Sequence, residues 1–122
     1  MQVCQFINQD VRERVIAPTM REDDSTKRMA LRKKIAEEDL PAKFAVLEQM
    51  IGPSGYLVGD KLSMADINFY VCANWIGMGV LDGVPKETIT QFPKLLKLIQ
   101  TLDDHPQIKA WNAEKNPKLP CF

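Results

Sequence analysis

The stretch that decides the fold is Gly55-Tyr56-Leu57-Val58-Gly59-Asp60-Lys61-Leu62-Ser63-Met64-Ala65-Asp66-Ile67. Gly59-Asp60 interrupts a short apolar segment, which predicts a turn. Ser63 then stands where a helix N-cap is expected, and Asp66, three residues later, can reach back to the Ser63 amide. This spacing is that of a capping box, with aspartate in place of the usual glutamate. We therefore predict a helix that begins directly after Ser63.

The helix that follows this capping box is expected to be buried. Between Asp66 and Asp82 only Tyr70 and Cys72 carry an ionisable side chain. A helix that is apolar around most of its circumference belongs to the interior of a helical protein. Asp66 is then expected to be buried as well, with a structural role in which its loss impairs folding. Trp75 and Trp111 are interpreted as core anchors.

The rest of the chain predicts further helices and no convincing strand. The residue before proline is pushed out of the helical region, so we expect Pro18 to close the first helix. Helical periodicity resumes after Pro41, which predicts a kink there rather than a break. Residues 116–122 are expected to be extended. The predicted helices cover residues 1–17, 26–51, 63–78, 93–103 and 106–115, which makes the chain an all-α bundle of about five helices.

Composition narrows the class of protein. The 122 residues include 16 basic and 16 acidic side chains, so the formal net charge is zero and no nucleic-acid partner is expected. No apolar run reaches transmembrane length, so no membrane partner is expected either. Three widely spaced cysteines indicate neither a disulfide framework nor a metal site. Without a basic and apolar leader, the sequence predicts a reduced, cytoplasmic protein of one domain.

The segment Gly59-Asp60-Lys61-Leu62-Ser63-Met64-Ala65-Asp66 resembles the helix-start signature of the C-terminal all-helical domain of cytosolic glutathione transferases. Three further motifs resemble the sigma class of that family, which includes prostaglandin D synthases and lens S-crystallins. The resemblance covers about residues 1 to 115. It implies the fold strongly and the chemistry weakly, because non-catalytic relatives keep the capping box for folding. The three motifs are Leu40-Pro41-x-x-Phe44-x-x-Leu47-Glu48, Phe92-Pro93-Lys94-Leu95 and His105-Pro106-Gln107-Ile108-Lys109-Ala110-Trp111.

In that family glutathione binds mainly to an N-terminal thioredoxin-like domain, where a Tyr, Ser or Cys hydrogen-bonds the glutathione sulfur. A hydrogen bond to the thiolate lowers the thiol pKa, so more nucleophile is present near neutral pH. This chain shows no βαβ pattern, so the resemblance implies that residues 1–122 lack that domain and hold no catalytic residue. We expect the chain to be a piece of a larger enzyme or a family member reduced to its helical half.

The resemblance also implies roles for residues of the first helix. An aspartate there reaches the γ-glutamyl amine of glutathione across the interface of a homodimer, and Asp10 in Asp10-Val11-Arg12 matches it. A carboxylate is the acceptor that an ammonium group requires. Arg12 and Arg14 are candidates for the electrophile pocket, where they would steer a carboxylate of glutathione or the electrophile. The alternative for all three is an ordinary solvated charge on a helix surface.

The wall of the electrophile pocket is implied to include residues of the buried helix. Measured from Asp66, the matching positions are Asn68, Val71 and Cys72. Asn68 and Cys72 are four residues apart, which places them on one helix face. The alternatives are a core-packing role for Cys72, since a buried cysteine behaves as a small hydrophobe, and a backbone-satisfying role for the Asn68 amide.

Two functions from different classes follow. The chain is either the C-terminal domain of a sigma-like glutathione transferase or a non-catalytic helical module. In the first case it forms part of the electrophile pocket and of the dimer interface, with glutathione as co-substrate and small apolar electrophiles or a prostaglandin-like endoperoxide as substrates, as in detoxification. In the second case it resembles the modules fused to translation factors and aminoacyl-tRNA synthetases, or a crystallin-like structural protein.

Overall fold

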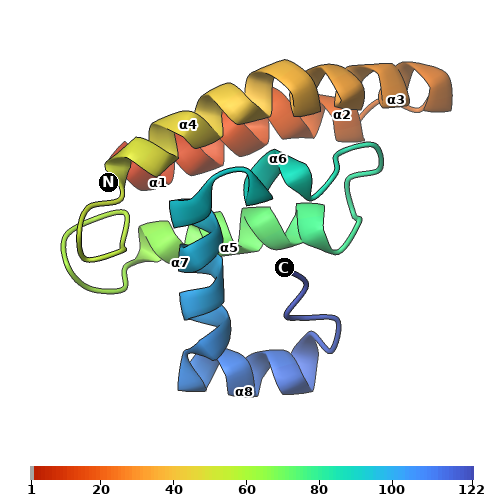
Figure 1. The fold of residues 1–122 in the computed structure, drawn as a ribbon. Helices are drawn as coiled ribbons and strands as arrows, with labels where there is room; N and C mark the ends of the chain where they lie inside the picture. Colours follow the sequence, from red (N-terminus) through yellow and green to blue (C-terminus); the bar gives the residue numbers. More distant parts are fainter. Residues whose placement is uncertain (1) are drawn as a thin grey trace.

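A computed structural model describes residues 2–122, and within them every regular element is a helix (Figure 1). The predicted all-α class is therefore confirmed. We call each uninterrupted run of helix a rod. Two of the rods are each built from three consecutive segments, and α6 is a short sixth rod beyond the five predicted helices. The elements are α1 (Gln2–Gln5), η1 (Phe6–Ile16), α2 (Ala17–Met20), α3 (Ser25–Lys34), η2 (Ile35–Asp39), α4 (Leu40–Met50), α5 (Met64–Gly77), α6 (Glu87–Thr90), α7 (Pro93–Asp104) and α8 (Pro106–Lys115).

The first rod does not end before Pro18, as the sequence led us to expect, but continues to Met20. Its middle part, η1, is a π-helix in which each amide bonds the carbonyl five residues earlier. Pro18 lies in the first turn of α2, directly after the π-helical segment. The wider turn also changes which residues face inward. The buried positions are Ile7, Val11 and Ile16, spaced by four and then five residues.

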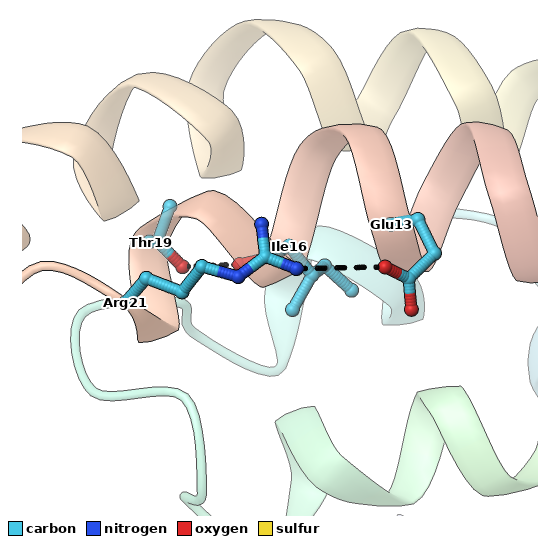
Figure 2. Close-up of polar contacts among 4 residues, drawn as sticks. All are labelled: Glu13, Ile16, Thr19 and Arg21. Carbon is cyan, nitrogen blue, oxygen red and sulfur yellow. Dashed lines mark hydrogen bonds and ion pairs between the residues drawn. The ribbon is translucent and has the colours of Figure 1, made fainter.

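Polar contacts hold the end of this first rod (Figure 2). The Thr19 hydroxyl donates to the Ile16 carbonyl at 2.6 Å and accepts from Arg32 Nε of α3 at 3.4 Å. Arg21 forms an ion pair with Glu13 at 3.7 Å, in which both side chains are largely exposed. Exposed pairs of this kind contribute little to stability. The turn between α2 and α3 is therefore fixed mainly by the buried Thr19 and Arg32.

The second rod passes through Pro41 without a break, as predicted. Its irregularity is the π-helical segment η2, which ends where the Leu40 amide bonds the Ile35 carbonyl. Pro41 again lies in the first turn of the segment that follows, α4. At the start of this rod Asp24 acts as N-cap and accepts from the amides of Thr26 and Lys27 at 2.9 and 3.1 Å.

Helix α5 lies in the centre of the molecule, with the two long rods on one side and α8 on the other, while α7 starts near α4 and runs past α5 toward α8 (Figure 1). Phe44 of α4 is completely buried. Its ring meets the edges of Phe69 of α5 and Phe92 before α7, with centroid separations of 6.0 and 6.4 Å. Edge-to-face contacts of this kind add to the stability gained from burial alone. Phe44 therefore joins three parts of the chain in one core.

The capping box at the start of α5 is present. The Ser63 amide and hydroxyl donate to Asp66 Oδ2 at 2.9 and 3.3 Å. The Asp66 amide in turn faces the Ser63 side chain and lies 3.1 Å from the Ser63 carbonyl oxygen. The other carboxylate oxygen, Oδ1, accepts from the Leu57 amide at 2.9 Å. Asp66 thus fixes both the helix start and the loop nine residues upstream of it.

The start of α7 is capped by a carboxylate from another helix. Glu48 of α4 accepts from the Leu95 amide at 2.8 Å and from the Lys94 amide at 3.1 Å. The residue at the cap position of α7, Phe92, has no side-chain acceptor of its own. The first amides of a helix lack partners within it and favour a negative charge. This contact brings together two of the motifs quoted above.

Replacing Glu48 by alanine is expected to lower the free energy of unfolding by about 1 kcal/mol, the usual cost of losing a helix cap. Urea unfolding followed by circular dichroism measures this difference. Glu38→Ala is the matched control, because Glu38 is an exposed helical glutamate that caps no helix in the described structure. Equal changes in the two variants would show that Glu48 does not act as a cap.

Candidate functional site

A groove of about 360 Å³ runs between α5, α8 and the extended residues that follow α8. Its apolar walls are formed by Val71 and Trp75 of α5 and by Ile108 and Trp111 of α8. The amides of Asn74 and Asn112 lie among them. A mostly apolar concavity with a few polar groups is the usual form of a small-molecule site.

One polar cluster joins the groove to α7. The Tyr70 hydroxyl donates to Asp103 Oδ1 at 2.5 Å and accepts from Asn112 Nδ2 at 2.8 Å. Burial, followed by the hydrogen bond to Asp103, raises the pKa of Tyr70 to about 12. Burial also raises the pKa of the Asp103 carboxyl, against the lowering effect of its bond to Tyr70. The phenol is therefore neutral near pH 7 and acts as a hydrogen-bonding group, not as a nucleophile or base.

This pKa predicts how stability changes at alkaline pH. The phenol of an unfolded tyrosine titrates near pH 10, whereas that of folded Tyr70 titrates at about 12. The folded state then holds one more proton between these values, so the free energy of unfolding falls as pH rises through this window. The fall should be shallower in Tyr70→Phe, measured by urea unfolding at several pH values. Parallel curves for the two proteins would contradict the shifted pKa.

The candidate glutathione-binding residue, Asp10, lies on η1 and away from this groove. Its side chain is 33% exposed and pairs with Arg14 of the same rod at 3.1 Å. Asp10 also lines a shallow pocket of about 350 Å³ with Phe6 and Met50. Arg14 is 75% exposed and does not line the groove. The structure therefore brings Asp10 and Arg14 together with each other but not with the residues of α5.

Arg12 does not line the groove but contacts Trp75, which does. Its guanidinium carbon is 4.8 Å from the ring centroid of Trp75, and Nη1 donates to Asn8 Oδ1 at 3.2 Å. Its Nε is buried and has no hydrogen-bond partner in residues 2–122. A cation over an indole face is held by the quadrupole of the ring. Arg12 therefore places a positive charge against the Trp75 ring.

The three candidate residues of α5 differ in their surroundings. Val71 is 43% exposed and lines the groove. Asn68 is half-buried and is not among the lining residues. Cys72 is completely buried, and this burial raises its pKa to about 12 although Arg12 lowers it. Cys72 thus occupies the core as a neutral thiol, which is its alternative role given above.

The sequence interpretation missed most of the groove. Trp111 was interpreted as a core anchor, but its side chain is 58% exposed. Trp75 is only partly buried and lines the groove beside it. The sequence offered no signal for this surface, because Trp75 and Trp111 lie on different helices that only the folded chain brings together.

Residues 2–122 contain neither a membrane-spanning helix nor a cluster of metal ligands. No helix among them is sufficiently long and apolar to cross a membrane. No three histidine, cysteine, aspartate or glutamate side chains gather there in a group suited to a metal ion.

Comparisons with known proteins agree with this fold. The family described as "Glutathione S-transferase, C-terminal domain" matches residues 9–115. A curated glutathione S-transferase of Pseudomonas putida is 30% identical over 93 residues, which are 74% of this chain and 41% of that protein. The chain therefore spans about two fifths of the length of this relative. No solved structure shows significant similarity.

Proposed function

Because this chain belongs to the glutathione S-transferase C-terminal domain family, we propose that it serves as the helical half of a glutathione transferase. In this proposal the groove along α5 and α8 forms the wall of the site for a small apolar electrophile. Glutathione is the co-substrate, held mainly by a thioredoxin-like domain that works with residues 1–122. The observation that carries the proposal is the groove itself, with its apolar walls and few amides.

The groove supports a binding role rather than a bond-making one. Tyr70, which lines the groove, and Cys72, which is buried on the same helix, are both neutral near pH 7 because burial raises their pKa values. The thiolate must then come from glutathione. Trp75 and Trp111 provide flat apolar surfaces for an aromatic or alkyl electrophile. Arg12, which contacts the Trp75 ring, adds a positive charge next to this wall, and that charge favours the negative charge that develops as a thiolate attacks.

We also propose a homodimer of sigma-like class in which Asp10 receives the amine of the partner's glutathione. Asp10 is accessible, and its present partner Arg14 is an exposed side chain of the same rod. An exposed ion pair is weak, so an ammonium group can replace Arg14 at the carboxylate at little cost. The motifs around Glu48 and Trp111, quoted above, support the sigma-like assignment.

Binding in the groove is testable because both tryptophans of the chain line it. A chloronitrobenzene electrophile is expected to quench tryptophan fluorescence saturably. Val71→Arg should weaken this binding at least about tenfold, equivalent to about 1.4 kcal/mol. Val46→Arg is the matched control, since Val46 is a helical valine of similar exposure, 41% against 43%, outside the groove.

Equal affinities of the two variants, or quenching that never saturates, would contradict the assignment of the groove. The second outcome would favour the non-catalytic module considered above.

A further inference from the structure

The last turn of α5 packs against part of the extended segment that follows α8. We call residues 116–122 the strap. Gly77, the last residue of α5, meets the strap without a side chain. A Cβ atom placed on Gly77 would overlap Cys121 Sγ and lie 2.6 Å from Cε2 of Phe122. Only glycine at position 77 leaves room for the strap, and we call this contact the seat of the strap. Figure 1 shows the strap turning back from α8 toward this end of α5.

Three side-chain hydrogen bonds hold the strap in this place, besides the bond from the Asn116 amide to the Asn112 carbonyl at 2.8 Å. Lys86 Nζ donates to the Cys121 carbonyl at 2.6 Å, and Cys121 Sγ lies 3.5 Å from Asn74 Oδ1. At the other end of the strap, Asn116 Nδ2 donates to Asn112 Oδ1 at 3.3 Å. Asn116 and Leu119 also line the groove. The strap is thus one wall of the groove and is fastened to both of the helices that form the others.

We propose that the strap is a releasable wall that sets the size of ligand the groove admits. Seated on Gly77, the strap closes one side of the groove with Leu119 and Asn116. Released, it leaves a wider cleft between α5 and α8 that takes bulkier apolar electrophiles. The identity of the ligand rests on the proposed function, whereas the seating of the strap does not.

The strap is suited to release because little holds it. None of its residues is fully buried, and the bond from Lys86 is exposed to solvent. It contains no helix within residues 116–122. Segments with few buried contacts and solvent-exposed hydrogen bonds open at much lower free energy than the whole domain. Opening of the strap therefore does not require α5 or α8 to unfold.

Gly77→Leu tests the seat directly. Leucine suits a helix better than glycine, so the expected consequence is displacement of the strap and not loss of α5. The readout is the rate at which an aromatic disulfide reagent labels Cys121, identified by mass spectrometry. Burial raises the pKa of the seated Cys121 thiol, so release both exposes the sulfur and increases its thiolate fraction. We expect labelling of Cys121 to accelerate at least about tenfold, with Cys4 unchanged as an internal reference.

Gly52→Leu is the matched control. Gly52 has no atom within 4 Å of an added Cβ and lies outside the strap, so the same substitution should leave Cys121 labelling unchanged. Lys86→Met is a second variant that removes one bond without adding bulk. Because the Lys86 charge lowers the pKa of Cys121, labelling of this variant is compared as the rate per thiolate from a pH series, and that rate should increase by a smaller factor. Equal Cys121 rates in Gly77→Leu and Gly52→Leu, with Lys86→Met also unchanged, would overturn the proposal. Should Gly77→Leu fail to fold, Lys86→Met alone decides between these outcomes.

Ligand binding separates this proposal from the proposed function. In Gly77→Leu a naphthalene-sized electrophile should gain affinity relative to a single-ring one, measured by tryptophan quenching. Faster Cys121 labelling without saturable binding of either electrophile would contradict the proposed function and leave the strap established. Saturable binding with unchanged Cys121 labelling would support the proposed function and contradict release of the strap.

Discussion

Replacing Asp66 by alanine is expected to lower the free energy of unfolding by about 3–5 kcal/mol. The Leu57 amide, the Ser63 amide and the Ser63 hydroxyl all donate to this completely buried carboxylate. Each buried donor left without a partner costs about 1–3 kcal/mol. A loss of this size is a large part of the total stability of an ordinary domain. Urea unfolding followed by circular dichroism measures it.

Two further variants make the Asp66 experiment specific. Asp66→Asn keeps the shape and one acceptor oxygen, so its effect should lie between those of the wild type and Asp66→Ala. Asp60→Ala removes an exposed aspartate from the same loop and should change stability by less than about 0.5 kcal/mol. A loss in Asp66→Ala as small as that in Asp60→Ala would contradict the role of Asp66 in joining the loop to α5.

The second large effect is expected for Phe44→Ala, at about 3–5 kcal/mol. Phe44 is completely buried and contacts both Phe69 and Phe92 edge-on. Its removal leaves a cavity between α4, α5 and the start of α7, which rigid helices fill only in part. Thermal unfolding by calorimetry measures the loss.

Phe44→Leu should restore most of this stability because it fills most of the cavity. Val46→Ala, on the exposed face of the same helix, should have almost no effect. A small loss in Phe44→Ala would mean that the three helices close around the missing ring.

The sequence predicted those parts of the fold that depend on neighbouring residues. The start of α5 at Ser63 is a local feature, because the cap and the carboxylate that completes it are three residues apart. The continuation of the second rod through Pro41 also follows from local periodicity. The sequence contains no comparable signal for contacts between residues that are far apart in the chain. The bonds from Leu57 to Asp66 and from Lys94 and Leu95 to Glu48 required the folded chain.

The helix end expected at Pro18 rested on the rule that the residue before proline leaves the helical region, whereas Ala17 keeps the helical angles φ −57° and ψ −39°. Periodicity analysis assumes a bond to the carbonyl four residues back, whereas η1 bonds five residues back and shifts its buried face. For the candidate site, the sequence indicated Val71 but not its neighbours across the groove. Trp111 and Asn112 come from α8, so only the packing of α8 on α5 shows that they share a surface with Val71.

The carboxylate of Glu48 also bears on the order of events during folding. It lies 46 and 47 residues before the amides it caps, so the start of α7 gains its partner only when α4 and α7 have met. Ser63 and Asp66, by contrast, can meet within a single nascent turn. Loss of the Glu48 cap should therefore speed unfolding while leaving the refolding rate nearly unchanged, as expected of contacts formed after the rate-limiting step. Asp66 and Glu48, two of the acids that begin helices in this chain, would then act at opposite ends of the same kinetic pathway.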